Sequence, residues 1–174
     1  LSVGRLTPEK SQCTIIDAIL KSKYKDRIKL LIFGEGPLRE KLLEQAEGLP
    51  NSLEIGIVTT EELVNYYNMA DIYVQASEIE TEGMAPLEAS ACGAPLLISD
   101  SPKSASGQFV LREEFLFKYG DANDLAQKFD YWFERPEELQ KLRAQYARAA
   151  EKYSISKIVD VMEDKYYELV ENYS

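Results

Sequence analysis

Two glutamates, Glu80 and Glu88, flank a Gly-Met-Ala-Pro segment in the sequence EIETEGMAPLEASACGAP. Pro86 is a favoured first residue of a helix, which predicts Ala85 at the N-cap and Glu88 in the first turn. Because this cap has no side-chain oxygen, Glu88 can either complement the helix dipole or accept two hydrogen bonds from a vicinal diol such as a ribose. Glu80, on the loop before the helix, can reach hydroxyl groups of a sugar held over the free helix amides, Met84 among them.

A second set of candidate residues lies in the segment GRLTPEK near the start of the chain. Its Thr-Pro pair is a good helix start, so we expect Lys10 in the first turn, near the positive end of the helix dipole. Arg5, on the loop before that helix, adds a second positive charge. Two cations beside free helix amides predict a diphosphate site. The alternative is that Lys10 extends into water and pairs with Glu9 or Asp17.

A third segment, IFGEGP, has a strand-like start and two glycines before a proline. A dinucleotide fingerprint needs a third small residue at the position of Arg39, so a standard NAD site is not expected. Gly34 and Gly36 permit either a close backbone approach to a ligand or a plain tight turn.

These segments need a scaffold, and the alternation of short apolar runs with amphipathic stretches predicts a Rossmann-like α/β fold. We expect a parallel sheet of about six strands with helices on both faces and a helical C-terminal section. The predicted strands are 1–4, 28–33, 52–58, 71–77, 94–99 and 115–119. The predicted helices are 8–23, 37–46, one that begins with a capping box at Thr59 and Glu62, 86–92 closed by Gly93, and several after residue 121.

The last predicted helix carries a long apolar stripe, which is typical of a core helix but could also face a partner domain. Its members are Ile155, Ile158, Val159, Met162, Tyr166, Leu169, Val170 and Tyr173.

Composition excludes several classes of function. Thirty acidic and twenty basic residues give a net charge of -10, which argues against a nucleic-acid binder. The sequence contains no histidine, so the commonest general base and zinc ligand are missing. No apolar run is long enough to span a bilayer and no signal peptide is visible, so we expect a cytoplasmic protein. The chain begins with LSVGRL instead of Met, and we expect it to be a piece of a longer protein.

In order and spacing, GRLTPEK, FGEGP, and Glu80 followed by Glu88 within EGMAPLEASACGAP resemble the C-terminal domain of retaining glycosyltransferases with the GT-B fold. This group is called glycosyltransferases group 1, or family 4. The resemblance covers nearly the whole chain, and it implies a domain that binds a nucleotide sugar donor.

By this resemblance, Arg5 and Lys10 hold the donor diphosphate, Glu80 contacts the transferred sugar, and Glu88 contacts the ribose. Arg5, Lys10 and Glu80 are therefore the expected catalytic residues. The expected donor-binding residues are Gly4, Gly34, Val58 (with Ile57, near the base), Gly83, Met84, Ala85, Leu87 and Glu88. No metal and no cofactor are expected, and a UDP-sugar is favoured over a GDP-sugar.

The resemblance also implies a partner, an N-terminal acceptor domain that this sequence lacks. We therefore expect residues 1–174 to be one domain, the C-terminal half of an enzyme that transfers a hexose to a polysaccharide or lipid. Alone it would bind the donor and be inactive, and any contact with the inner face of a membrane would come from the missing half. The alternatives are a non-catalytic nucleotide-sugar sensor and half of a sugar-nucleotide epimerase.

Overall fold

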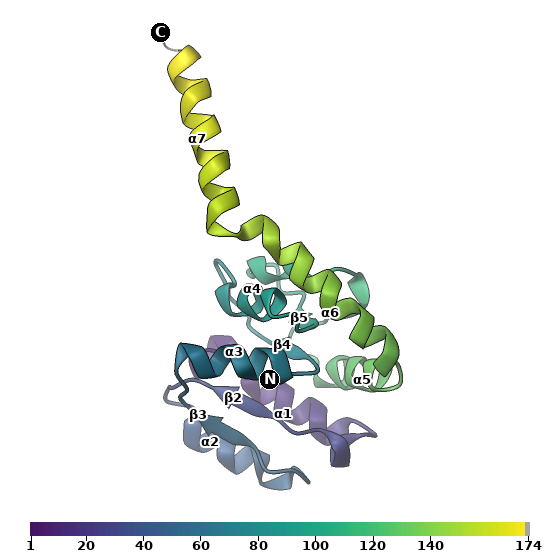
Figure 1. Ribbon diagram of the computed structural model, residues 1–174. Coiled ribbons are helices and arrows are strands. Elements are labelled where there is room, and N and C mark those ends of the chain that lie inside the picture. Colours follow the sequence, from purple (N-terminus) through teal and green to yellow (C-terminus); the bar gives the residue numbers. More distant parts are fainter. Residues whose placement is uncertain (173–174) are drawn as a thin grey trace.

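Short parallel strands alternate with helices throughout the first two thirds of the chain (Figure 1). The computed structural model describes residues 1–172. The strands are β1 Ser2–Val3, β2 Leu31–Phe33, β3 Glu54–Gly56, β4 Tyr73–Gln75, β5 Leu96–Ser99 and β6 Leu116–Phe117. Each falls inside a predicted run, so the α/β prediction is confirmed.

The strands form two three-stranded parallel sheets, β1-β2-β3 and β4-β5-β6, and the prediction of one six-stranded sheet is wrong. The two sheets meet between β1 and β4. The Leu1 nitrogen donates to the Ile72 carbonyl at 3.0 Å, and the Val74 amide donates to the Leu1 carbonyl at 2.8 Å. These are the hydrogen bonds of a parallel pair. All six strands therefore end at the same edge of the molecule.

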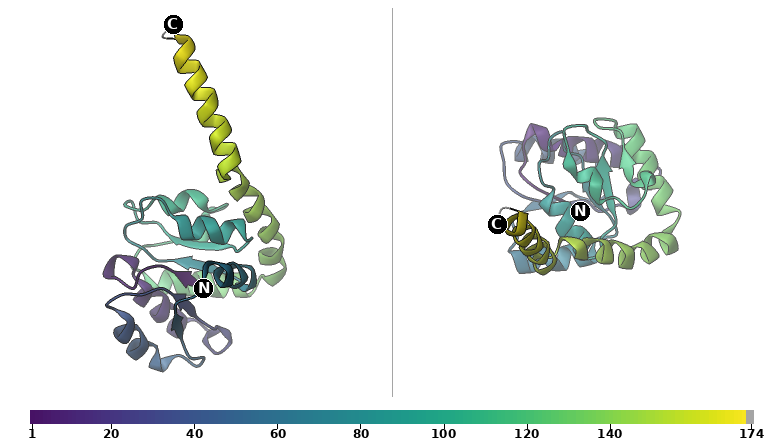
Figure 2. Two further views of the ribbon diagram at one scale, coloured as in Figure 1. Left: turned by 60° about the vertical axis from the view of Figure 1, so that its left-hand side comes forward. Right: turned by 90° about the horizontal axis from the view of Figure 1, so that it is seen from above.

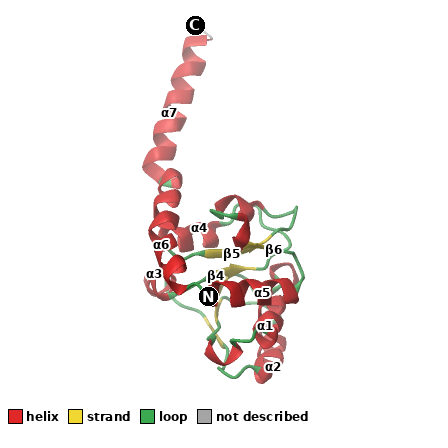
Figure 3. Cartoon of the chain, turned by 90° about the vertical axis from the view of Figure 1, so that its right-hand side faces the viewer, coloured by secondary structure: helices red, strands yellow, loops and turns green. Residues whose placement is uncertain are grey.

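Helices cover both faces of the sheets, as predicted. They are α1 Gln12–Lys21, α2 Arg39–Gln45, α3 Thr60–Met69, α4 Met84–Ala91, α5 Ala122–Phe133, α6 Pro136–Ala150 and α7 Ile155–Asn172. Helix α1 packs against α2 and α5 in one layer, and α4 packs against α3 and α6 in the other. Figure 3 shows β4, β5 and β6 between α4 and α5.

The predicted helix 8–23 is broken in two. A 3-10 helix spans Pro8–Lys10, and α1 begins only after Ser11, whose φ of 50° lies in the left-handed region. The Thr7 side chain does not cap the first segment. Lys10 therefore ends a 3-10 turn and does not lie in the first turn of an α-helix, because the left-handed residue interrupts the helical ladder.

Helix α4 begins two residues earlier than predicted. Its N-cap is Gly83, in a left-handed conformation with φ 72°, so the assignment of Ala85 to the N-cap is wrong. Glu88 consequently lies in the second turn. A Cβ at Gly83 would lie 2.8 Å from both Phe109 and Ser106, so packing as well as φ requires glycine here. Two other local predictions are confirmed, the capping box of α3 and the left-handed Gly93 after α4.

The core combines the apolar strands with the inner faces of α5 and α6. The rings of Phe115 and Trp132 stack with centroids 4.1 Å apart, and Tyr146 meets Phe115 edge-on at 5.6 Å. All three side chains are fully buried. The inner faces of α5 and α6 therefore belong to the core.

Helix α7 projects from the body, and the left view of Figure 2 shows it without a neighbour along its outer length. No residue of α7 is buried, and Ile155 is 83% exposed. The core interpretation of its apolar stripe is therefore wrong for the described residues, and Tyr173 lies outside them. Among residues 1–172, no helix combines the length and apolar character needed to cross a membrane.

Candidate functional site

The loops that follow β1 and β2 pack directly on each other at the carboxyl edge of the sheet. A Cβ at Gly34 would lie 2.0 Å from the Gly4 carbonyl oxygen, and one at Gly36 would lie 2.4 Å from the Leu6 oxygen. The Leu6 amide donates to the Glu35 carbonyl at 2.7 Å. Both glycines are therefore required by backbone packing between loops, which holds the β1 loop in a fixed position.

Lys10 and Glu80 meet at this edge. The Lys10 Nζ atom lies 2.5 Å from Glu80 Oε2, and the two side chains are only 15% and 17% exposed. Lys10 therefore does not extend into water or pair with Glu9 or Asp17, the alternative considered from the sequence. Gly4, which directly follows β1, lies next to the lysine, since a Cβ there would be 4.0 Å from the Lys10 side-chain carbons.

Arg5 lies on the same loop as Lys10 but points outward. Its side chain is 75% exposed, and its guanidinium is 3.4 Å from Glu9 Oε1. The Thr7 hydroxyl donates to that oxygen at 2.7 Å and lowers the pKa of Glu9, an effect that Arg5 and Lys10 reinforce. The buried Gln12 amide donates to the Arg5 carbonyl at 2.8 Å and holds the loop backbone. The loop is thus fixed while the Arg5 guanidinium remains accessible.

Two residues beneath Glu80 were not identified from the sequence. Gln75 Nε2 donates to Glu80 Oε2 at 2.7 Å, and the Tyr73 hydroxyl lies 2.7 Å from Gln75 Oε1. Burial raises the pKa of Tyr73, so its hydroxyl stays protonated. The signal was a glutamine in the middle of the otherwise apolar strand DIYVQAS.

Glu88 is exposed and is held by a third buried residue. The Tyr67 hydroxyl, on α3, donates to Glu88 Oε2 at 3.2 Å. Burial raises the pKa of Tyr67 well above its ordinary value, so it remains a donor. The Tyr67 and Tyr73 rings are neighbours, with centroids 5.9 Å apart. Tyr67 therefore supports Glu88 directly, and Tyr73 supports Glu80 through Gln75.

The N-terminus of α4 lies between the two glutamates in the chain. The first hydrogen bond into the helix runs from the Leu87 amide to the Gly83 carbonyl at 3.1 Å. The amides of Met84 and Ala85 precede it and have no intrahelical partner. Met84 is exposed, whereas Ala85 and Leu87 are half-buried. These amides are available to an anion or a polar ligand.

Val58 does not lie at a strand end. Strand β3 stops at Gly56, so Ile57 and Val58 belong to the loop before α3. Ile57 is 70% exposed and Val58 is half-buried. The loop still follows the carboxyl end of its strand, the same edge as Gly4 and Gly34.

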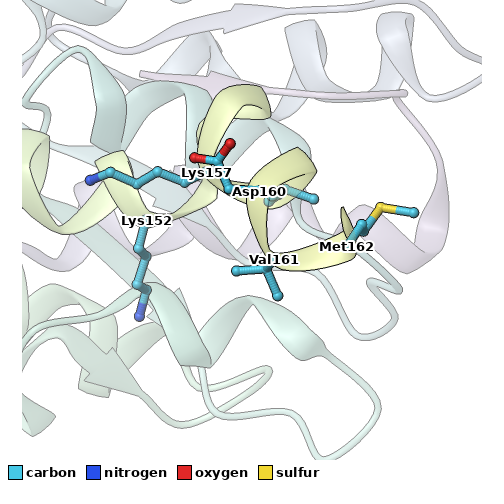
Figure 4. Close-up of a pocket in the computed structure, with 6 residues that line it drawn as sticks. Lys152, Lys157, Asp160, Val161 and Met162 are labelled. Carbon is cyan, nitrogen blue, oxygen red and sulfur yellow. The ribbon is translucent and has the colours of Figure 1, made fainter. Parts of the chain in front are cut away.

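The open hollow at the base of α7 is separate from these residues. It is lined by Lys152, Lys157, Ile158, Asp160, Val161 and Met162 (Figure 4). None of the candidate residues lines it. Within residues 1–172, no group of three or more His, Cys, Asp or Glu side chains is arranged to hold a metal ion.

A family model and solved structures both relate this chain to glycosyltransferases. The family model "Glycosyl transferases group 1" matches residues 1–153. The catalytic domain of cholesterol-alpha-glucosyltransferase from Helicobacter pylori superposes with a TM-score of 0.83 and 37% identity, over 88% of this chain and 99% of that one.

Other relatives are much longer than this chain. Alpha-monoglucosyldiacylglycerol synthase from Streptococcus pneumoniae is 33% identical over 106 residues, 59% of this chain and 24% of the relative. The pneumococcal O-GlcNAc transferase GtfA, solved with UDP and GlcNAc, shares the fold, with a TM-score of 0.80 and 22% identity over 97% of this chain and 35% of that chain. The chain thus spans about a quarter of the curated relative. From the family match and the 37% identity to the Helicobacter domain, we conclude that the chain belongs to the glycosyl transferases group 1 family.

Proposed function

We propose that this chain is the donor-binding domain of a retaining glycosyltransferase of family 4, which transfers a hexose from a UDP-sugar. The observation that carries the proposal is the contact between Lys10 and Glu80, at 2.5 Å, in which Glu80 belongs to the loop that leads into α4. At this carboxyl edge of the sheet, the cation can bind a diphosphate and the carboxylate can bind sugar hydroxyls.

In this proposal each candidate residue has a defined role. Negative charge builds up on the departing diphosphate as the anomeric carbon becomes cation-like, and Arg5 and Lys10 stabilise that charge. Loss of one such donor typically costs about 3 kcal/mol in the transition state. Glu80 binds the transferred sugar and Glu88 the ribose. The amides at the start of α4 bind sugar and phosphate oxygens.

The relatives bear on the choice of donor and acceptor. The expectation of a UDP-sugar comes from the sequence resemblance, and the GtfA neighbour, which shares the fold, was solved with UDP. A Mycobacterium tuberculosis relative that is 38% identical over 98 residues is named GDP-mannose-dependent, so the titration below includes both kinds of donor. Cholesterol and a diacylglycerol lipid appear in the names of two relatives, which favours a lipid over a polysaccharide as the acceptor. A lipid acceptor would place the whole protein at the inner face of a membrane.

The acceptor site belongs to a domain outside this chain. The relatives' greater length and the exposed apolar stripe of α7 support this division. We propose that residues 1–174 act as the C-terminal half of the enzyme, that α7 contacts the other half, and that the chain alone binds donor without transferring sugar.

The test is a thermal-shift and calorimetric titration of this chain with UDP, UDP-glucose, GDP-mannose and ADP-glucose. A ligand at a hundred times its Kd stabilises by about 2.7 kcal/mol, which raises Tm by about 5 °C or more in a domain of this size. We expect this shift with UDP-glucose. Lys10→Ala should weaken UDP binding by on the order of tenfold.

The matched control is Lys29→Ala. Lys29 is a half-exposed lysine that precedes β2, at the opposite edge of the sheet, where it donates to the Ser52 carbonyl. We expect its loss to leave UDP binding unchanged. Equal binding by wild type and Lys10→Ala, or equal losses in the two variants, would contradict the assignment.

A further inference from the structure

Gln75 is a buried side-chain amide at the carboxyl end of β4, and it contacts Glu80 of the candidate site. It is 4% exposed, and its register partner in β5 is Ile98. A buried side-chain amide in an apolar strand is costly unless its groups are hydrogen-bonded. Both ends of this amide have partners, Tyr73 on one side and Glu80 on the other.

The neighbours fix which way the amide faces. The Tyr73 hydroxyl keeps its proton and lies 2.7 Å from the amide, a shorter contact than its 3.2 Å to the Val3 carbonyl. A hydroxyl that donates requires an acceptor, so the Gln75 oxygen faces Tyr73 and its NH2 group faces Glu80. The donor that Gln75 offers to Glu80 is therefore set by a buried tyrosine.

The backbone of Glu80 is held separately. Its amide approaches the Lys103 carbonyl at 3.3 Å, and its carbonyl accepts from the Ala105 amide at 2.8 Å. Gln75 and Lys10 both bind the same carboxylate oxygen, Oε2. These two contacts leave Oε1 to other partners. Because Gln75 comes from a hydrogen-bonded strand and Lys10 has a flexible side chain, Gln75 is the more rigid of the two restraints.

We propose that Gln75 is a positioning residue that acts through Glu80 and sets the affinity for the sugar part of the donor. This inference rests on the proposed function. Gln75 holds Oε2 so that Oε1 faces the transferred sugar, while the nucleotide is bound by other residues. Loss of Gln75 should therefore weaken binding of a UDP-sugar and leave binding of UDP nearly unchanged.

The test compares calorimetric Kd values for UDP and UDP-glucose in wild type and in Gln75→Met, which conserves length and removes the amide. A hydrogen bond to a charged group corresponds to on the order of tenfold in affinity. We expect the ratio of the UDP Kd to the UDP-glucose Kd to fall by about this factor. Gln75→Asn, which keeps the amide but is too short to reach Glu80, should behave in the same way and serves if the first variant does not fold.

A double-mutant cycle separates positioning from a structural role. In the Glu80→Ala background, Gln75→Met should cause no further change in the ratio, since the residue through which it acts is gone. An unchanged ratio in Gln75→Met, or equal effects in both backgrounds, overturns the inference while the proposed function stands. Wild-type protein that binds neither UDP nor UDP-glucose overturns the proposed function and this inference together.

Discussion

Lys10 and Glu80 are 70 positions apart in the chain, and their Nζ and Oε2 atoms are 2.5 Å apart in the fold. The contact joins the loop after β1 to the loop after β4, the two strands along which the sheets meet. Because both side chains are largely buried, each charge depends on the other for compensation. Any anion that binds Lys10 must share it with this carboxylate.

Because Lys10 is shared in this way, we expect Glu80→Gln to change the affinity for UDP and the affinity for UDP-glucose differently. The amide keeps the shape of the side chain and removes the negative charge next to Lys10, so repulsion between the carboxylate and a diphosphate disappears. We expect UDP to bind as tightly as in wild type or tighter, and the additional affinity for UDP-glucose to be lost. Titration calorimetry at two salt concentrations measures the Kd of UDP and the Kd of UDP-glucose. Weaker UDP binding with an intact preference for UDP-glucose would contradict the prediction.

Tyr67→Phe should weaken the binding of UDP and of UDP-glucose equally, unlike Glu80→Gln. The Tyr67 hydroxyl donates to Glu88, the residue assigned to the ribose, and ribose is present in UDP and in UDP-glucose alike. We therefore expect both Kd values to rise by about fivefold, the effect of one ordinary hydrogen bond, with their ratio unchanged. The variant should have no effect in a Glu88→Ala background. A change in the ratio would show that Tyr67 acts on the sugar.

From the sequence, Lys10 and Glu80 are each predicted to follow a strand of a parallel sheet, and the ends of such strands share one edge, so loops far apart in the chain converge there. The direct ion pair between the two side chains was not predicted. The start of α4 could not be predicted either. The left-handed Gly83 is fixed by packing against Phe109 and Ser106, residues more than twenty positions away. Local helix signals, such as the proline at position 86, carry no information about such contacts.

The roles of the buried side chains that support the site could not be predicted from the sequence either, although the glutamine in the strand DIYVQAS marked one polar position. Tyr67, Tyr73 and Gln75 are ordinary helix or strand residues locally, and their roles arise only from contacts across elements.

The apolar stripe of α7 was ambiguous for a related reason. A periodic stripe shows that one face of a helix is apolar, but it does not show whether the same domain covers that face.

Ser11 offers a test of local strain. Its φ of 50° makes it the one non-glycine residue with positive φ in the part of the chain that the structure describes. Ser11→Gly and Ser11→Ala both remove the hydroxyl that donates to the Pro8 carbonyl at 3.2 Å, so comparison of the two variants isolates the backbone. We expect the glycine variant to be more stable by about 1 kcal/mol, since only glycine adopts this conformation without cost. Urea denaturation measures the difference, and equal stabilities would contradict the strain argument.

The exposed position of α7 predicts that the rest of the chain folds without it. A chain ending at Ser154 lacks α7, and none of the side chains of residues 155–172 is buried. We expect its Tm, followed by circular dichroism, to lie within about 2 °C of the complete chain. A chain ending at Phe133 is the control. It loses the fully buried Leu142 and Tyr146 and should not fold.

The same truncation distinguishes a free helix from one that contacts the proposed acceptor domain. If the proposed other half packs on α7, removal of α7 from a protein that contains both halves exposes the surface that the helix covers. We then expect Tm to fall by several degrees in that protein, although it does not fall in this chain. Equal melting temperatures for the longer protein with and without α7 would refute the proposed contact between α7 and the other half. A large loss of stability in the isolated chain would instead show that α7 supports this domain directly.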